Sequence, residues 1–137
     1  MTRKEARETA FSILFEAGFD SAPDPIAHYE VAIAERGVED DKYVRLILRL
    51  VGEHLAEIDG AIRTYSVNWK FERISRVSLA VLRLACCEMF YCEDIPLRVS
   101  VNEAVELSKQ YDDEKAYGFV NGILNSLLHD ARAVEEK

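Results

Sequence analysis

The sequence predicts one all-α domain that packs around a single buried helix. Residues 77–92 carry charge only at Arg83 and Glu88, and apolar side chains occur on every side of this segment, which is typical of a buried helix. In the other segments apolar residues recur at intervals of three and four, and none alternates apolar and polar residues as a strand does. A chain of 137 residues is long enough for one domain with a proper core and too short for two ordinary ones.

Two helices are predicted at the start of the chain. Thr2 and Glu5 have the spacing of a capping box, which marks the beginning of a helix. Apolar residues then repeat at helical intervals until Gly18, so the first helix should span about residues 3–18. Pro25 is placed to begin a second helix, which should stop at Gly37.

The third predicted helix is long and leads to the central one. The acidic residues at positions 39–41 suit its N-terminal end, where the helix dipole is positive. Its apolar positions continue to about Tyr65. We expect a bend near Gly52 or Gly60.

Two more helices are predicted after the central one. Pro96 forces a break, because the residue before a proline disfavours helical geometry. Ser100 and Glu103 repeat the capping-box spacing and indicate a short helix that ends near Gln110. The acidic residues 112–114 then begin the last helix.

Two glycines one turn apart interrupt the last predicted helix. Gly118 and Gly122 each cost about 1 kcal/mol relative to Ala, so we expect another backbone to come close at that face. Packing against a neighbouring helix is the favoured reason, and access for a ligand is the alternative. The tail from Ala131 should fray.

The charge is negative overall and unevenly distributed. A net charge of −8 argues against a general nucleic-acid binder, because affinity for phosphate comes from accumulated Lys and Arg. Residues 61–83 nevertheless hold five basic groups against one acidic group, whereas residues 20–60 hold ten acidic and four basic groups. One part of the surface is therefore expected to attract a polyanion and another to repel it. Solvated helix faces with scattered charge are the alternative interpretation.

No catalytic, metal or cofactor site is predicted. The three cysteines, at positions 86, 87 and 92, are interpreted as small apolar residues in a reducing compartment, and the histidines have no partners at ligand spacing. Neither a Gly-rich phosphate loop nor a nucleophilic motif with a matching base occurs. The chain begins without the apolar core of a signal peptide, which predicts a cytoplasmic protein with no membrane role.

Four polar residues lie on otherwise apolar helices. These are Arg83, Glu88, Asn102 and Asn121, and burial would oblige each of them to find a hydrogen-bond partner. We interpret all four as structural. Arg83 and Glu88 are five residues apart and poorly placed to meet, so each should reach another helix or a helix end.

A basic and aromatic stripe runs along the first predicted helix. Steps of four residues give Arg3, Arg7, Phe11 and Phe15, with Lys4 beside the first. Bases of single-stranded RNA stack on such rings while Arg and Lys hold the phosphates. Aromatic residues of an amphipathic helix also serve as core, and this second interpretation is favoured for both rings, more so for Phe11.

Several motifs stand at characteristic separations along the chain. They are ARE at residues 6–8, LRLA at 82–85 followed by Glu88, VNEAVEL at 101–107 and FVNGIL at 119–124. Together they resemble the NusB family of bacterial transcription antitermination factors, and the similarity covers the whole chain. The resemblance implies an all-helical fold of two packed three-helix subdomains, about residues 1–66 and 67–137, around the buried central helix.

The resemblance also implies a function and partners. Family members bind the single-stranded boxA element of nascent ribosomal RNA together with a small-subunit ribosomal protein, also called NusE. The resulting complex makes RNA polymerase resist termination. The family protein itself performs no catalysis and needs no cofactor. Some members self-associate, so both a monomer and a homodimer are compatible with the resemblance.

Position by position, the resemblance implies two sets of site residues. The RNA-facing set is Arg3, Lys4, Arg7, Phe15, Tyr65 and Phe119, and the set facing the ribosomal protein is Glu72, Arg76, Ser78 and Lys115. Glu5 stands where the family often has another basic residue, which predicts weak RNA binding by the isolated protein. Lys115 stands where an acidic residue is common, so it either weakens a charge pairing with the basic partner or adds an RNA contact.

Two other functions compete with this one. The chain is also similar to the RNA-recognition module of rRNA cytosine methyltransferases, but it carries no Gly-rich cofactor motif and ends about ten residues after its last apolar stripe. A helical adaptor or homodimerisation module without an RNA role is the second alternative. A complex that depends on RNA sequence would separate the adaptor from the other two functions.

Overall fold

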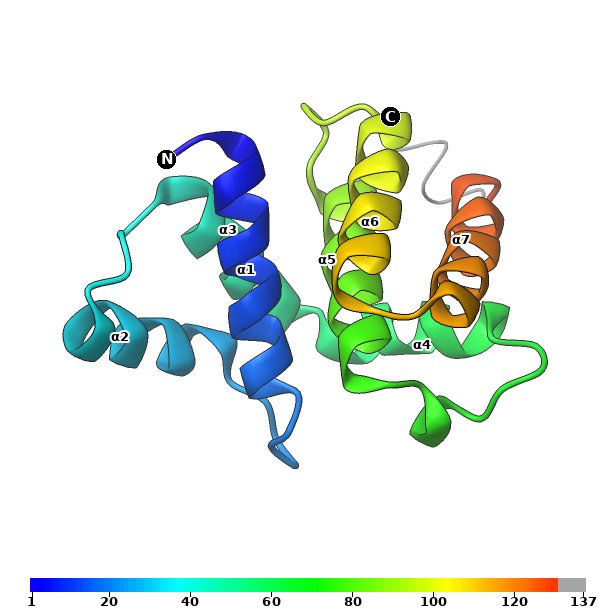
Figure 1. The fold of residues 1–137 in the computed structure, drawn as a ribbon, viewed down its shortest axis with the longest axis horizontal. Helices are drawn as coiled ribbons and strands as arrows, with labels where there is room; N and C mark the ends of the chain where they lie inside the picture. Colours follow the sequence, from blue (N-terminus) through cyan, green and yellow to red (C-terminus); the bar gives the residue numbers. More distant parts are fainter. Residues whose placement is uncertain (131–137) are drawn as a thin grey trace.

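The computed structural model describes residues 1–130, which form α-helices joined by short connections (Figure 1). The helices are α1 (Arg3–Ala17), α2 (Pro25–Arg36), α3 (Lys42–Glu53), α4 (Leu55–Tyr65), α5 (Arg76–Tyr91), α6 (Leu97–Tyr111) and α7 (Glu114–Leu128), and a 3-10 turn, η1 (Phe71–Arg73), precedes α5. No strand occurs among residues 1–130, and the predicted all-α class is confirmed. The expected fraying from Ala131 lies outside the described residues.

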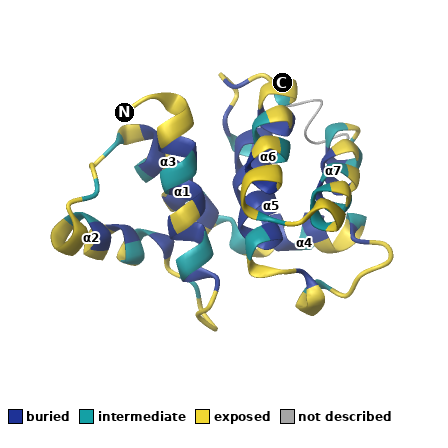
Figure 2. Cartoon of the chain, viewed as in Figure 1, coloured by how far each residue is buried: buried dark blue, intermediate teal, exposed yellow. Residues whose placement is uncertain are grey.

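Helix α5 is the centre of the fold, as predicted. Figure 1 shows α1, α2 and α3 on one side of it and α6 and α7 on the other, with α4 running beneath. Every residue from Ser78 to Phe90 is buried, and α5 is correspondingly dark in Figure 2. Within the described part of the chain, no helix is long and apolar enough to cross a lipid bilayer.

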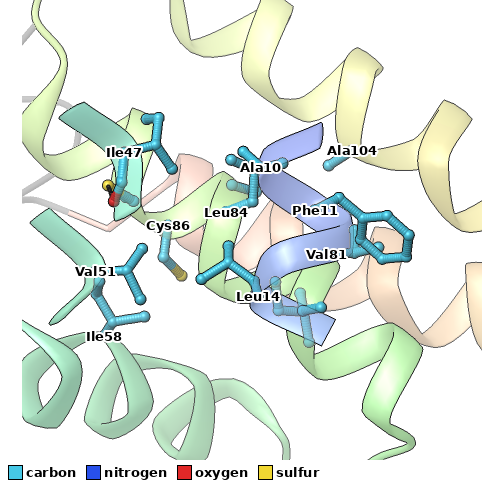
Figure 3. Packing of buried hydrophobic residues seen from close by; sticks show 14 of the residues in the cluster. Ala10, Phe11, Leu14, Ile47, Val51, Ile58, Val81, Leu84, Cys86 and Ala104 are labelled. Atoms are coloured by element: carbon cyan, nitrogen blue, oxygen red, sulfur yellow. Dashed lines mark hydrogen bonds between the residues drawn. The ribbon is translucent and has the colours of Figure 1, made fainter. Parts of the chain in front are cut away.

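Apolar side chains from several helices meet on α5. Figure 3 shows Leu14 of α1, Ile47 of α3 and Ile58 of α4 gathered around Leu84 and Cys86 of α5. All five side chains are at most 3% exposed. Because full burial of one large aliphatic side chain contributes about 1.5 to 3 kcal/mol, this contact zone is a main source of stability. The three cysteines are buried thiols, in agreement with their predicted role as small apolar residues.

The predicted third helix is divided into two. Helix α3 ends at Glu53 and α4 begins at Leu55, so the predicted bend near Gly52 lies at His54. The His54 ring stacks on Tyr91 with centroids 4.1 Å apart. Helix α4 packs against α5 and α7, on the side of the second half of the chain (Figure 1). The subdomain boundary near residue 66 stays a prediction.

Helix α6 begins earlier than predicted. Its first residue is Leu97, directly after Pro96, whereas the capping-box spacing placed the start at Ser100. Ser100 does not cap the helix, because its hydroxyl donates a hydrogen bond to Oε1 of Glu88 at 2.8 Å. The motif was misinterpreted because this acceptor comes from another helix.

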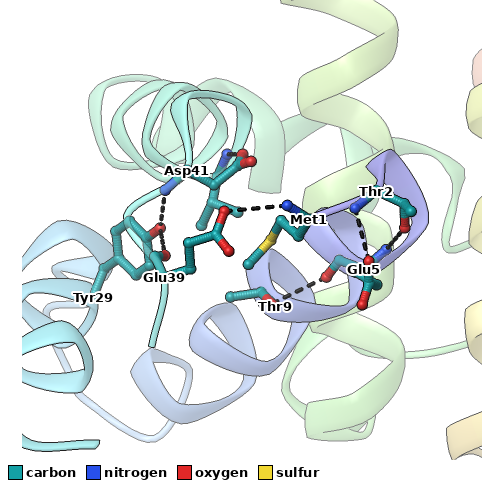
Figure 4. A network of polar contacts seen from close by, with 8 residues as sticks. Met1, Thr2, Glu5, Thr9, Tyr29, Glu39 and Asp41 are labelled. Atoms are coloured by element: carbon teal, nitrogen blue, oxygen red, sulfur yellow. Dashed lines mark hydrogen bonds and ion pairs between the residues drawn. The ribbon is translucent and has the colours of Figure 1, made fainter. Parts of the chain in front are cut away.

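The N-terminal end of α1 is capped and tied to the loop between α2 and α3 (Figure 4). Thr2 and Glu5 form the predicted capping box, in which each side chain accepts a hydrogen bond from the backbone of the other. The amino group of Met1 lies 3.2 Å from Glu39, and the Tyr29 hydroxyl donates to the Glu39 carbonyl at 2.6 Å. Hydrogen bonds with Thr2 lower the pKa of the Glu5 side chain, and the bond from the Thr2 backbone has the largest effect.

Candidate nucleic-acid interface

Arg7, predicted to contact RNA, lies in the core instead. It is 6% exposed, and its Nε donates to Oε2 of Glu88 at 2.8 Å while Nη2 donates to Oε1 at 3.4 Å. Glu88 also accepts hydrogen bonds from the hydroxyl groups of Tyr43 and Ser100. The Arg7 side chain is 7% exposed, so the guanidinium bound to Glu88 has little surface left for a phosphate. Arg7 is therefore a structural residue, and its assignment to the RNA interface is wrong.

The carboxylate of Glu88 joins four helices. Arg7 comes from α1, Tyr43 from α3 and Ser100 from α6, and all three donate to this one group of α5. Burial, followed by the negative charge of Glu88, raises the pKa of Tyr43. The phenol is thereby kept protonated and serves as a donor. The network fixes the relative positions of α1, α3, α5 and α6.

A second buried ion pair joins α4 to α5. Arg83 donates from Nε and Nη2 to the two carboxylate oxygens of Asp59, each at 2.9 Å. The prediction that Arg83 and Glu88 each reach another helix is confirmed. For Asn102, which is exposed, and Asn121, which is half-buried, the argument from burial does not apply.

At the N-terminal end of α1, Arg3 and Lys4 remain exposed. The Arg3 guanidinium lies 4.4 Å from the centroid of the Tyr43 ring, and Lys4 lines a cleft of about 210 Å³ between α1 and α6. The carboxylates of Glu8, Glu103 and Glu106 line the same cleft. Arg7 and Lys109 line it as well, so three basic side chains balance the three acidic ones.

The aromatic stripe of α1 continues beyond the predicted rings. Phe11 is buried, and Phe15 is half-buried with its ring 6.5 Å from Phe11 and 5.2 Å from Phe19. Phe19 follows the helix and is 60% exposed. The predicted core role of Phe11 is confirmed. Phe15 packs against the core and also reaches the surface, so both interpretations of this ring remain compatible with its position.

The residues assigned to the ribosomal protein differ in exposure. Arg76 is exposed, donates to the Gly18 carbonyl at 2.6 Å and lies over the Phe19 ring at 5.2 Å. Ser78 is 2% exposed, and its hydroxyl donates to Asp112 at 2.6 Å. Ser78 thus joins α5 to Asp112, the residue that caps the C-terminal end of α6. Its assignment as a direct partner contact is corrected.

The structure brings Tyr65, Phe119 and Lys115 together, although the last was assigned to a different partner. They line a cleft of about 390 Å³, here called the aromatic cleft, with further lining from Val67, Asn68, Trp69, Gly118, Gly122 and Ile123. The Trp69 and Phe119 rings meet edge to face with centroids 5.6 Å apart. The Tyr65 hydroxyl donates to Asp130 at 2.6 Å. None of the described residues that line this cleft is acidic.

The glycines of α7 lie on the aromatic cleft and not between helices. Among residues 1–130, a Cβ atom built on Gly118 or Gly122 would meet nothing within 4 Å, so the predicted close approach of another helix is wrong. The alternative, access for a ligand, fits their position. Trp69 was missed by the sequence reasoning, although a tryptophan beside Lys70 in a segment without helical periodicity was a usable signal.

A basic surface segment adjoins the aromatic cleft. Lys70 and Arg73 are exposed, and the Arg63 guanidinium lies 4.1 Å from the centroid of the Phe71 ring. Glu72, assigned to the ribosomal protein, is exposed on the same turn. Arg83 belongs to the internal pair described above and does not contribute. Within residues 1–130, no group of three or more His, Cys, Asp or Glu side chains is arranged to hold a metal ion.

The chain is similar to one protein family over nearly its whole length. Residues 4–129 match the NusB family. The transcription antitermination protein NusB of Clostridium acetobutylicum is 40% identical over 139 residues, which cover 100% of both chains. Its counterpart from Bacillus velezensis is 43% identical over 132 residues, covering 95% of this chain and 98% of the relative.

Solved structures are similar over almost the whole chain. NusB of T. maritima has a TM-score of 0.87 at 32% identity and covers 99% of this chain and 96% of its own. A complex of the antitermination factors NusB and NusE with double-stranded RNA contains a chain with a TM-score of 0.78 at 27% identity, covering 91% of this chain and 94% of that one.

Proposed function

The chain belongs to the NusB family, and from this premise we propose that it is a non-catalytic transcription antitermination factor. It binds boxA-type single-stranded RNA of nascent ribosomal transcripts together with the small-subunit ribosomal protein NusE. The complex acts on RNA polymerase so that the enzyme resists termination. A cytoplasmic location is part of the same proposal, because the partners named here work there.

One observation carries the RNA part of the proposal. Exposed basic side chains at Arg63, Lys70 and Arg73 adjoin an aromatic cleft with no acidic residue among its described lining, in a chain whose net charge is −8. Positive charge beside aromatic rings is the combination that binds single-stranded nucleic acid. Arg3 and Lys4, which are exposed at the N-terminal end of α1, are two further cations that we assign to RNA binding.

A binding titration tests the function. Fluorescence anisotropy of a labelled boxA RNA is measured with the protein alone, with NusE alone and with both, and a scrambled RNA of equal composition serves as the control. We expect weak binding by the protein alone and tight, sequence-dependent binding by the pair. Equal affinity for both RNAs would favour the adaptor. The relatives named above are antitermination proteins matched over nearly their whole length, which favours the factor over a methyltransferase module.

Lys70→Ala should flatten the salt dependence of RNA binding in the ternary complex. Loss of one phosphate contact to a single strand lowers the slope of log affinity against log salt concentration by roughly 0.7. The matched control is Lys42→Ala, an exposed lysine of α3 within the acidic part of the chain, which should leave the slope unchanged. The same measurement on Lys4→Ala tests the N-terminal contact. If Lys70→Ala and the unaltered protein show the same salt dependence of RNA affinity, Lys70 makes no phosphate contact and η1 does not belong to the RNA-binding surface.

Glu72→Lys should weaken binding to NusE without changing the fold. Glu72 is an exposed acidic group on a basic turn, where it can attract a basic partner. Exposed charge pairs contribute about 0.2 to 1 kcal/mol, so the dissociation constant measured by calorimetry should rise by about 1.4- to fivefold. Glu35→Lys on α2 makes the same charge change elsewhere and should have no effect. If both variants bind NusE equally well, the partner surface lies away from η1.

A further inference from the structure

We propose that Asp130, just beyond the end of α7, is a positioning residue for RNA binding that holds the Tyr65 ring in its productive orientation. The inference rests on the proposed function and on the predicted RNA-facing role of Tyr65. It adds a residue that acts on RNA affinity through Tyr65 and does not touch the RNA.

The Tyr65 hydroxyl is fixed by a strong hydrogen bond. It donates to Oδ2 of Asp130 at 2.6 Å, a length typical of a bond from a hydroxyl group to a carboxylate. Both residues are half-buried, so the bond is stronger than it would be in open water. The Asp130 backbone N–H donates to the Leu127 carbonyl at 3.0 Å, which ties the acceptor to the last turn of α7.

The contact restrains the ring because it joins the ends of two helices. Tyr65 is the last residue of α4, and Asp130 follows α7, whose earlier residues Lys115 and Phe119 line the aromatic cleft together with Tyr65. The ring is therefore held at one end by the backbone of α4 and at the other by its hydroxyl. A side chain that is ordered in advance loses less conformational entropy when a ligand binds, and this raises the affinity.

The charge of Asp130 by itself works against RNA binding. A carboxylate repels phosphate, and Asp130 is not among the described residues that line the aromatic cleft. The hydrogen bond to Tyr65 is the way in which this carboxylate favours RNA. The competing explanation is a purely structural clamp, since α4 and α7 also pack against each other.

Two substitutions at position 130 separate the hydrogen bond from the charge. Asp130→Ala and Asp130→Asn both remove the negative charge, but Asn keeps an oxygen that can accept from the Tyr65 hydroxyl. Affinity for labelled boxA RNA is measured by anisotropy in the complex with NusE. We expect Asp130→Ala to bind about 2- to 12-fold more weakly than Asp130→Asn, the range for ordering one side chain on binding. Equal affinities of the two variants would overturn the proposal.

A second pair of measurements links the effect to Tyr65. Tyr65→Phe keeps the ring and removes the hydroxyl, so it should also weaken RNA binding about 2- to 12-fold. In the Tyr65→Phe background, Asp130→Ala and Asp130→Asn should bind RNA equally well, because neither can then accept the bond. A difference that persists in this background would show that position 130 acts without Tyr65, which contradicts the positioning role.

A packing variant distinguishes positioning from the structural clamp. Ile58→Val, at a fully buried position of α4, lowers the melting temperature through lost packing but leaves Tyr65 and Asp130 unchanged. Measured below its melting temperature, it should bind RNA with the affinity of the unaltered protein. If it weakens RNA binding as much as Asp130→Ala does, loosening of α4 is sufficient and the proposal is refuted.

The outcomes also separate this inference from the proposed function. Tyr65→Ala removes the ring and should weaken RNA binding more than Tyr65→Phe. If the unaltered complex binds boxA RNA and Tyr65→Ala keeps full affinity, Tyr65 does not face the RNA, so the positioning role is overturned while the function stands. If the unaltered complex shows no sequence-dependent RNA binding, the function fails and the inference fails with it.

Discussion

Glu88→Ala should lower the free energy of unfolding by about 3 to 5 kcal/mol, since removing one partner of a buried ion pair leaves the other charge unpaired. Glu88 is 1% exposed and accepts hydrogen bonds from Arg7, Tyr43 and Ser100. Without it, the guanidinium and two hydroxyl groups lose their acceptor inside the core. Urea denaturation followed by circular dichroism measures the change.

Two further variants make this result specific. Glu93→Ala removes an exposed carboxylate just beyond the end of α5 and should change stability by no more than about 0.5 kcal/mol. The double variant Arg7→Met with Glu88→Leu removes both charges, so it should be clearly more stable than Glu88→Ala. A loss below about 1 kcal/mol in Glu88→Ala would mean that the Arg7 charge finds water or another acceptor. Arg7 would then again be available to RNA.

The helix face that carries Arg7 could be predicted from the sequence, but the partner of Arg7 could not. Steps of four residues placed it on a basic line with Arg3, and helical periodicity was correct, because α1 spans Arg3–Ala17. Its partner Glu88, however, lies 81 positions away along the chain. Periodicity fixes the face of a helix on which a residue lies, but not what another helix brings against that face. The same limit applies to Ser100, whose hydroxyl donates to the Glu88 carboxylate and therefore does not cap α6.

Polar residues within an apolar helix were the more informative signal. Burial of Arg83 and Glu88 required partners whatever the packing, so a structural role followed from the central segment alone. Composition also located the basic segment that contains Lys70 and Arg73, although one of its counted cations, Arg83, turned out to be internal. The identity of each partner depended on tertiary distances and was beyond the reach of sequence reasoning.

The prediction that another helix packs against Gly118 and Gly122 was wrong for the same reason, because tertiary surroundings are not a local property of the sequence. The helix-forming cost of Gly118 and Gly122 indicated that something benefits from the missing side chains, which is a local property. Whether that is a packed helix or open space depends on what lies above the face, and within residues 1–130 no atom lies within 4 Å of an added Cβ atom. Trp69, which borders the same space, is far from both glycines along the chain. The aromatic cleft thus emerges only from the fold.

Asp59→Ala should also destabilise the protein strongly, by about 3 kcal/mol, and the effect should be purely structural. Asp59 is 8% exposed and binds Arg83 through two hydrogen bonds of 2.9 Å, a bidentate geometry that gives strong charge-assisted bonds. The variant leaves the Arg83 guanidinium buried between α4 and α5 without its carboxylate. Because α4 ends at Tyr65 beside the aromatic cleft, a loosened α4 is the most direct way in which a core change can reach the candidate interface.

Thermal unfolding measures the expected loss of stability, and RNA binding tests whether the effect is purely structural. Asp59→Ala should melt at a lower temperature than the unaltered protein, while Asp94→Ala, which removes an exposed carboxylate, should melt normally. Replacing both partners, Asp59→Leu with Arg83→Met, should recover much of the loss, because no unpaired charge then remains buried. Below its melting temperature, Asp59→Ala should bind RNA with the salt slope of the unaltered protein, since neither partner of the pair faces solvent. A reduced slope would place Arg83 on the RNA path and contradict its assignment to the core.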